Sequence, residues 1–174
     1  MKRNSFVLLG VALALAGCAT NAGEPGNLDR RKQELRRYVE SGGYERGIAA
    51  VAAQARAWVE RRTAKRAAGE RLAVVFDIDE TLLSNWPEIA REDFGYVASA
   101  WDAWEAEAKA PAIGPVNEVY LAARRLGVEV ILLTDRSEHE RAVTEKNLRA
   151  VGCGGYAALI FKPDGSRETA AEFK

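Results

Sequence analysis

The feature that most constrains the fold is an apolar run followed at once by two carboxylates. Residues 72–76 read Leu-Ala-Val-Val-Phe, and Asp77 and Asp79 follow directly. Five apolar residues in succession predict a strand that is buried on both faces, as in parallel sheets covered by helices. Open α/β sheets bind ligands at the carboxyl ends of such strands. Two carboxylates at that place repel each other unless a cation compensates them, so the pattern predicts a divalent metal ion and carboxylate chemistry.

The rest of the chain predicts an alternation of helices and strands. Hydrophobic periodicity and turn residues indicate helices at 28–39, 44–67, 114–126 and 138–151, and further strands at 128–133 and 157–161. A β-α-β-α-β order implies a doubly wound parallel sheet with right-handed connections. We therefore expect an α/β domain over residues 28–174, with a small helical insert and additional N-terminal helices.

The helix expected at 44–67 is amphipathic. Its apolar residues recur at spacings of three and four; they are Ile48, Val51, Ala52, Ala55, Trp58 and Val59. This periodicity predicts that one face packs on the core, with Trp58 as a core residue.

The segment 86–115 is rich in aromatic side chains. They are Trp86, Phe94, Tyr96, Trp101 and Trp104. One interpretation is a small helical insert that packs on its own apolar residues. The other is an aromatic rim over the active site that stacks on a flat substrate group. The two interpretations are compatible.

The N-terminus predicts export and anchoring. Lys2 and Arg3 precede an apolar stretch at 6–16, which is too short to span a bilayer and is typical of a signal peptide over residues 1–17. The sequence Leu-Ala-Gly-Cys that ends at Cys18 resembles the bacterial lipobox, which implies that Cys18 is acylated and that residues 18–27 form a tether. The alternative is an ordinary export signal with an incidental cysteine. The resemblance implies an outer-membrane lipoprotein of the cell envelope, facing the periplasm or the cell exterior.

Charge and composition exclude several classes of function. The 25 basic residues balance the 25 acidic ones, so nucleic acid polymers find no excess of positive charge. Cys153 has no second cysteine besides Cys18, so we expect no internal disulfide, and we interpret it as a small residue in a glycine-rich turn rather than as a nucleophile. His139 is the sole histidine, which disfavours zinc and histidine phosphatases. We expect it to be solvated near a helix start.

The sequence VFDIDETLLSN at residues 75–85 resembles the first motif of the haloacid dehalogenase (HAD) superfamily of phosphatases. It is closest in pattern to the acid phosphatases of that superfamily, which include class B and C bacterial enzymes and plant storage proteins. The resemblance, which spans residues 44–174, implies a HAD-like Rossmannoid fold. It also implies that Asp77 is the nucleophile and that Asp79 is the acid and base. Mg²⁺ would bridge the Asp77 carboxylate, the Asp79 main-chain carbonyl and the phosphate.

Later motifs of this family have counterparts at the ends of the other strands. The resemblance implies that Thr134 binds a phosphate oxygen and that Arg136 pairs with phosphate or holds its loop. Asp135 stands where relatives commonly have Gly or Asn, so we expect it to point away. Lys162 and Lys174 are both candidates for the lysine that shields the nucleophile, and the aromatic-Lys pattern favours Lys174.

The fourth family motif, of the type Gly-Asp-x-x-x-Asp, is not found up to Lys174. We therefore expect the C-terminal strands to be missing, the metal to be short of ligands, and residues 72–76 to form an exposed edge. The function expected from the resemblance is a magnesium-dependent acid phosphatase that acts on small phosphomonoesters such as nucleotides. The alternatives are a non-catalytic relative that binds phosphate ligands or serves storage, and an inactive fragment.

The lipobox generates a prediction that fractionation can test. Cys18→Ala removes the acylation site, so the variant is expected to become soluble or to remain unprocessed, whereas the wild type partitions with membranes. Two or more acyl chains are needed for stable anchoring. Identical fractionation of both forms in a Gram-negative host would show that the lipobox interpretation is wrong.

Overall fold

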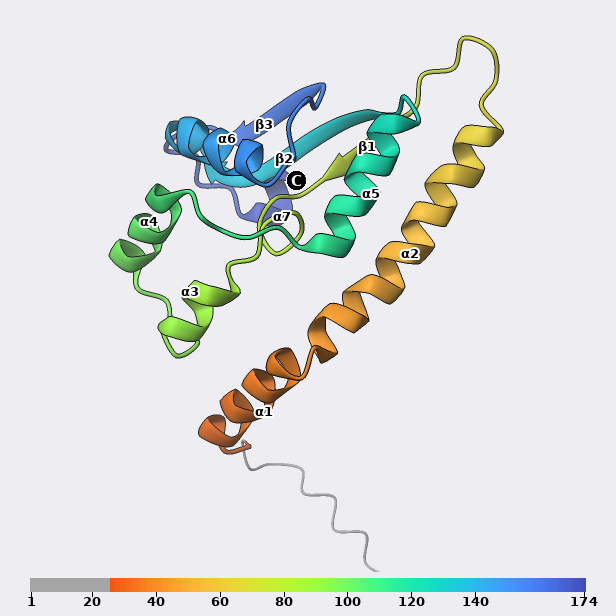
Figure 1. Ribbon diagram of the computed structural model, residues 1–174. Helices are drawn as coiled ribbons and strands as arrows, with labels where there is room; N and C mark the ends of the chain where they lie inside the picture. Colours follow the sequence, from red (N-terminus) through yellow and green to blue (C-terminus); the bar gives the residue numbers. More distant parts are fainter. Residues whose placement is uncertain (1–25) are drawn as a thin grey trace, which may run out of the picture.

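The structure is a computed structural model that describes residues 26–174 (Figure 1). The expected signal peptide, Cys18 and most of the expected tether lie outside the described residues. The elements in chain order are α1 (Leu28–Glu40), α2 (Gly43–Ala64), β1 (Ala73–Phe76), α3 (Trp86–Arg91), α4 (Ala98–Glu107), α5 (Gly114–Arg125), β2 (Glu129–Ser137), a 3₁₀ turn (Glu138–Glu140), α6 (Arg141–Ala150), β3 (Ala158–Lys162) and α7 (Ala170–Phe173). None of the helices in the described part of the chain has the length and apolar character needed to cross a membrane.

The three strands form a parallel sheet in the order β1-β2-β3. The predicted α/β fold with a parallel sheet is therefore confirmed. β2 extends beyond its predicted end at residue 133, because the ladder is irregular after Leu133 and pairing resumes where Ser137 lies opposite Lys162. This extension carries the sequence Thr-Asp-Arg at 134–136 inside the strand, rather than in a loop.

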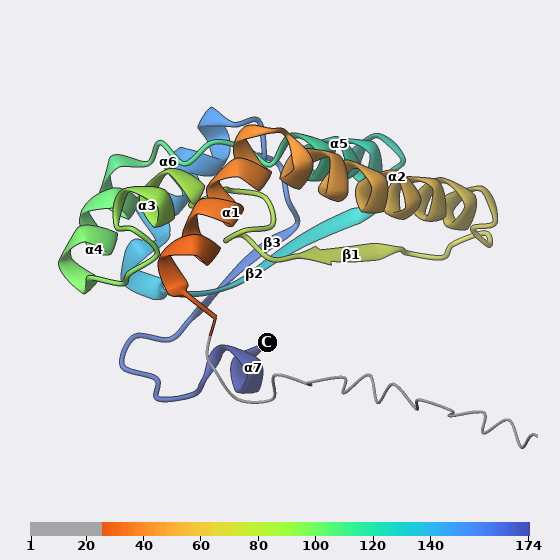
Figure 2. The ribbon, with the colours of Figure 1, turned by 90° about the horizontal axis from the view of Figure 1, so that it is seen from below.

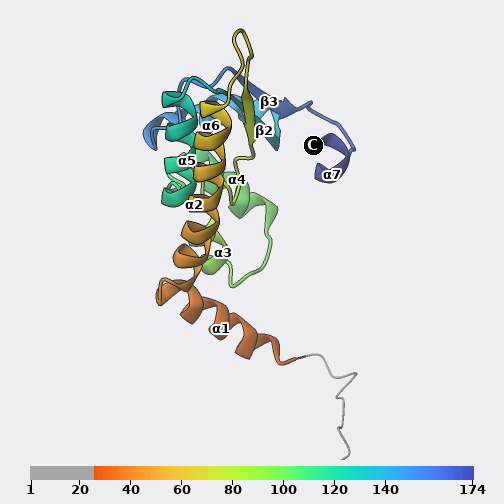
Figure 3. The same cartoon turned by 90° about the vertical axis from the view of Figure 1, so that its right-hand side faces the viewer.

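In the described residues, the larger helices cover one face of the sheet. Figures 2 and 3 show α2, α5 and α6 on one side and the short α7 on the other. Leu132 and Phe161 are buried, while Val75 is 56% exposed and Ile160 is 44% exposed. The prediction that the first strand is buried on both faces is therefore wrong for this part of the chain, because alternate residues of β1 point away from the helices. β1 also lies at the edge of this sheet, as expected.

Helix α2 buries less of its apolar face than the sequence predicts. Ala52 and Val59 are buried, but Val51 is 66% exposed and Trp58 is 60% exposed. The prediction of Trp58 as a core residue is wrong. α2 packs mainly against α5, and a single helical neighbour covers only a narrow stripe, here residues seven apart along the helix.

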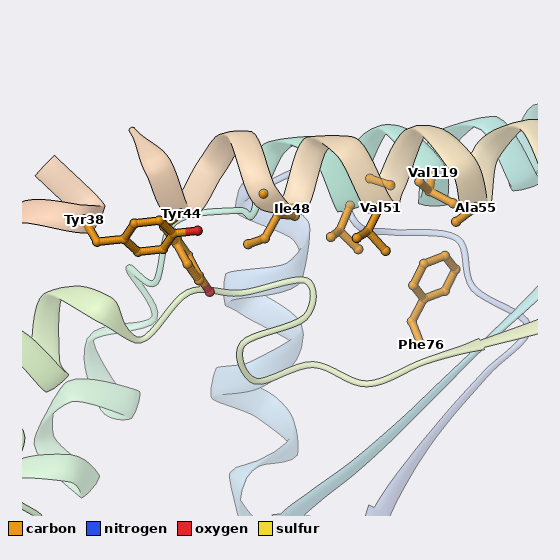
Figure 4. Close-up of a pocket in the computed structure, with 10 residues that line it drawn as sticks. Tyr38, Tyr44, Ile48, Val51, Ala55, Phe76 and Val119 are labelled. Atoms are coloured by element: carbon orange, nitrogen blue, oxygen red, sulfur yellow. The ribbon is translucent and has the colours of Figure 1, made fainter. Parts of the chain in front are cut away.

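An apolar groove lies between α2 and the end of β1. Its volume is about 440 Å³. Figure 4 shows Phe76 below α2, with Ile48 and Val51 above it and the rings of Tyr38 and Tyr44 at one end. Its lining carries no carboxylate, amine or imidazole, so this groove is not suited to phosphoryl transfer.

The different burial of Val59 and Val51 in α2 can be tested with a matched pair of substitutions. Val59→Ala removes two buried methyl groups and leaves a cavity, so it is expected to lower the free energy of unfolding by about 1.5–3 kcal/mol. Val51→Ala, on the exposed side of the same helix, is expected to change it by less than about 0.5 kcal/mol. Urea unfolding of both variants checks the pair, and equal losses would contradict the described packing of α2.

Candidate active site

The segment after β1 folds into a tight loop around one carbonyl group. The carbonyl oxygen of Ile78 accepts the N–H groups of Thr81 at 3.2 Å and of Leu82 and Leu83 at 2.9 Å each. Both leucine side chains are fully buried, so they fix the loop to the core. This geometry explains why two leucines follow the carboxylates in the motif, and it holds Asp77 and Asp79 at the carboxyl end of β1.

Glu80 stabilises a strained point of this loop. Its φ of 51° lies in the left-handed region, which a non-glycine residue adopts at a cost. One carboxylate oxygen accepts the hydroxyl of Tyr44 at 3.1 Å, and the other accepts the main-chain N–H of Asn85. The side chain of Glu80 thus supports the conformation that separates Asp79 from the helix α3.

Asp77 lies beside a lysine. Its Oδ1 accepts the N–H of Ile78 and the ammonium of Lys174, each at 2.8 Å. Lys174 Nζ is also 3.0 Å from Oδ1 of Asp135. Burial alone would lower the pKa of Lys174, but hydrogen bonds to the two carboxylates raise it above its ordinary value, so the side chain stays charged. Lys162 instead donates to the main-chain carbonyl of Glu168, which favours Lys174 as the lysine of the site.

Asp79 is held by two partners. Its Oδ1 accepts Arg136 Nη2 at 2.6 Å and Asn85 Nδ2 at 2.8 Å, and its Oδ2 accepts Arg136 Nε at 2.9 Å. Burial alone would raise the pKa of Asp79, but the guanidinium of Arg136, with help from Asn85 and Lys174, leaves this pKa below its ordinary value. The two motif carboxylates therefore occupy different environments.

Arg136 is the buried cation of the site, with its side chain 5% exposed. Besides binding Asp79, its Nη1 donates to Oγ1 of Thr144 at 3.1 Å. Two roles were expected for Arg136, and the structure shows the one in which it holds neighbouring segments together. Its contact with phosphate stays a prediction.

Thr134 is fully buried, and its Oγ1 accepts the N–H of Arg136 at 3.2 Å. Its contact with phosphate also stays a prediction. Asp135 is exposed but turns toward Lys174 rather than away from the site.

A cleft of about 840 Å³ opens beside Asp79. It is lined by Asp79, Tyr96, Trp101, Asp102, Glu105, Ala106, Asp135, Arg136, Ser137, His139, Glu140 and Val143. Tyr96 is 72% exposed, and its ring centroid lies 5.9 Å from that of Trp101. Trp86 packs edge-on against Phe94, and Trp104 is buried. The insert therefore packs on its own aromatic residues, as the first interpretation has it, and Tyr96 and Trp101 line the cleft. Their stacking on a substrate stays a prediction.

Glu105 is a buried acid of this cleft that the sequence analysis missed. Its side chain is 11% exposed and lies 3.7 Å from Arg136 Nε, and it accepts the indole N–H of Trp101 at 3.1 Å. Burial, followed by a hydrogen bond with Glu140, raises the pKa of Glu105 to about 8 despite the nearby Arg136. The protonated form of Glu105 is therefore favoured up to a higher pH than that of an ordinary glutamate. No local pattern in the sequence marks it, because its environment comes from three separate elements.

The expected metal site draws few ligands from the described residues. Within residues 26–174, no three side chains of His, Cys, Asp or Glu gather closely enough to hold a metal ion. The carboxylate of Asp79 is occupied by Arg136 and Asn85. The donors that remain from the expected set are the carboxylate of Asp77 and the main-chain carbonyl of Asp79. Mg²⁺ at phosphate sites commonly uses one or two carboxylates with phosphate and water oxygens, so this donor set fits an ion held jointly with a substrate.

Two residues set aside in the sequence analysis lie as predicted. Cys153 is fully buried, with its Sγ 3.3 Å from Oδ1 of Asn117, and burial raises its pKa to about 11. A thiol in that state is a poor nucleophile. His139 is exposed at the start of the 3₁₀ turn, and its Nδ1 lies 2.9 Å from Oδ1 of Asp164.

Comparisons with known proteins show which family this chain is similar to. The family model described as HAD superfamily, subfamily IIIB (acid phosphatase), matches residues 24–174. Acid phosphatase 1 of Solanum lycopersicum is 38% identical over 104 residues, which are 58% of this chain and 41% of that protein. Vegetative storage protein 1 of Arabidopsis thaliana is 35% identical over 104 residues, 58% of this chain and 38% of that protein. The matched region thus spans about two fifths of the length of these relatives.

A solved structure shares the fold. The class C acid phosphatase from Bacillus anthracis superposes with a TM-score of 0.67 at 21% sequence identity, over 78% of this chain and 59% of that one. The same protein with tungstate bound gives the same TM-score. This likeness supports the HAD-like α/β architecture predicted from the sequence.

The raised pKa of Glu105 predicts a pH dependence of stability. The unfolded side chain ionises near pH 4.5, whereas the folded one ionises near 8. Below pH 4.5 the acid is protonated in both states. Between these values only the unfolded state releases the proton, so stability is lost as the pH rises, by up to about 1.4 kcal/mol per pH unit. Glu105→Gln is expected to reduce this loss between pH 5 and 8 by about 2 kcal/mol or more, as measured by urea unfolding.

Glu118→Gln is the matched control for this experiment. Glu118 has a side chain that is 73% exposed, so its variant is expected to retain the wild-type dependence of stability on pH. If Glu105→Gln unfolds with the same pH dependence as the wild type, Glu105 is not a protonated buried acid.

Proposed function

Because this chain belongs to subfamily IIIB of the HAD superfamily, the acid phosphatases, we propose that it hydrolyses phosphomonoesters through an aspartyl-phosphate at Asp77. The observation that carries this proposal is the unequal surroundings of the two motif carboxylates. Asp77 lies beside the ammonium of Lys174, and Asp79 is held by Arg136 and Asn85. Pairs of carboxylates in different environments take different roles in catalysis.

In the first step, Asp77 attacks phosphorus. The contacts with Lys174 and with the N–H of Ile78 both fall on Oδ1, so Oδ2 is the better placed oxygen to attack. The new O–P bond forms as the bond to the leaving alcohol breaks, and Asp79 gives the departing oxygen a proton. Lys174 contributes a positive charge beside the developing negative charge.

In the second step, water releases the phosphate. Asp79, now a carboxylate, takes a proton from water as that water attacks phosphorus, which frees phosphate and restores Asp77. The contacts with Arg136 and Asn85 hold the pKa of Asp79 below its ordinary value, which favours the carboxylate form that acts as the base in this second step.

We propose Mg²⁺ as the cofactor. It would be held by the Asp77 carboxylate and the Asp79 main-chain carbonyl together with the substrate phosphate, and it would supply charge neutralisation there. Thr134, in the adjacent strand β2, is proposed as a further phosphate ligand.

The proposed substrates are small phosphomonoesters, including nucleotides. Their leaving group would lie in the cleft beside Asp79, where Tyr96 and Trp101 offer aromatic surfaces. The tungstate in a structurally similar protein supports binding of a tetrahedral oxyanion in this fold. We propose that acylation of Cys18 anchors the protein to a membrane of the cell envelope.

The nucleophile assignment has a direct test. Asp77→Asn leaves an amide that cannot form the phosphoenzyme, so hydrolysis of an aryl phosphate with Mg²⁺ is expected to fall by about 10³-fold or more. Mass spectrometry of the acid-quenched wild type is expected to place a phosphoryl group on Asp77. Asp164→Asn, a surface variant at a carboxylate that binds His139, is expected to stay within about twofold of the wild type.

Two results would contradict the proposal. Turnover by Asp77→Asn near the wild-type rate would remove the nucleophile assignment. A wild type that binds phosphate but turns over no small phosphomonoester would favour the non-catalytic alternative. Vegetative storage protein 1 of Arabidopsis, one of the relatives, bears a name of that kind.

A further inference from the structure

A buried chain of hydrogen bonds ends on the Asp79 carboxylate. The indole Nε1 of Trp104 donates to Oδ1 of Asn85 at 2.8 Å, and Nδ2 of Asn85 donates to Oδ1 of Asp79 at 2.8 Å. Asn85 is 1% exposed and Trp104 is 8% exposed. We propose that Trp104 and Asn85 are positioning residues that orient the Asp79 carboxyl for proton transfer to the leaving group. This inference rests on the proposed function, because it assigns supporting residues to the same reaction.

The chemistry of the three groups allows one orientation of the Asn85 amide. An indole nitrogen donates and cannot accept, and an ionised carboxylate accepts and cannot donate. The amide oxygen must therefore face Trp104, and the amide nitrogen must face Asp79. Without the indole N–H, rotation of the amide by half a turn would bring its oxygen against the carboxylate, which is repulsive. Trp104 thus determines which end of Asn85 meets Asp79.

The chain makes the two oxygens of Asp79 unequal. Arg136 donates to both of them, through Nη2 to Oδ1 and through Nε to Oδ2. Asn85 adds a second donor to Oδ1 alone. An oxygen that already accepts two N–H groups is a poor carrier for a proton, so Oδ2 is the atom from which the proton is transferred.

The same chain connects Asp79 to the cleft. Trp104 belongs to α4, and the same helix carries Trp101 and Glu105, which line the cleft beside Asp79. A leaving group seated against α4 therefore contacts the helix that also fixes the proton donor. The helical insert thus has two functions: to receive the leaving group and to orient the acid.

A purely structural role would have a different signature. Loss of packing around Asn85 would reduce turnover of all substrates alike. Loss of proton transfer affects a substrate according to its leaving group, because an alkoxide needs protonation as it departs, whereas a nitrophenolate departs without it. The comparison of two leaving groups therefore separates positioning from folding.

The experiment uses Trp104→Phe, which removes the N–H donor and keeps an aromatic ring. With Mg²⁺ and the full chain, kcat/KM for glycerol phosphate is expected to fall by about tenfold or more, while kcat/KM for p-nitrophenyl phosphate stays within about twofold. The ratio kcat/KM is used because it reports formation of the phosphoenzyme and not its hydrolysis, in which Asp79 acts on both substrates alike. Trp86→Phe, the same change at another tryptophan of the insert, is expected to leave both rates near those of the wild type. Equal losses on the two substrates in Trp104→Phe would overturn the inference.

A second measurement does not depend on turnover. The indole ¹⁵N–¹H resonance of Trp104, assigned by its absence in Trp104→Phe, is expected to shift in Asp79→Asn and to stay in place in Asp77→Asn. The indole resonances of Trp58 and Trp86 are expected to stay in place in both variants. A Trp104 resonance that Asp79→Asn leaves unmoved would overturn the inference. A wild type without turnover would count against the proposed function alone, and the resonance would then decide the role of the chain.

Discussion

The ion pair between Arg136 and Asp79 is the interaction on which the rest of the site depends. It joins the loop after β1 to the end of β2 through two hydrogen bonds. The same guanidinium reaches α6 through Thr144 and lies close to Glu105 of α4. Removing an arginine from water is costly, and the cost is offset only where its donors are satisfied with good geometry. The partners of Arg136 come from the loop after β1, from α6 and from α4. Arg136 therefore connects segments that are far apart in the sequence.

This ion pair also separates the two carboxylates of the motif. Asp79 contacts Arg136 and Asn85, whereas Asp77 contacts Lys174. Two carboxylates two residues apart would otherwise repel each other in similar surroundings. The ion pair thus fixes the position of Asp79 and places the two carboxylates in different surroundings. Leu82, Leu83 and the side chain of Glu80 stabilise the backbone of the loop that carries both acids.

The sequence predicts those parts of the structure that depend on local pattern. The apolar run at 72–76, the motif after it and the alternation of elements were enough to predict a parallel α/β sheet with Asp77 and Asp79 at its carboxyl end. Periodicity alone could not predict burial, because it shows which residues share a face and not how many neighbours cover it. Trp58 and Val75 are exposed in the structure for that reason. Asn85 belonged to the recognised motif, but its role depends on Trp104, nineteen residues away. Glu105 had no sequence signal, since its raised pKa arises from burial between distant elements.

Arg136 and Asp79 are expected to stabilise each other as a partly buried ion pair. A double-mutant cycle with Arg136→Gln, Asp79→Asn and the double variant, measured by urea unfolding, tests it most directly. Each single variant leaves the other partner without its counterion, so the double variant is expected to be more stable than the sum of the two losses implies. We predict a coupling free energy of about 1–3 kcal/mol. Losses that add within about 0.3 kcal/mol would contradict the account.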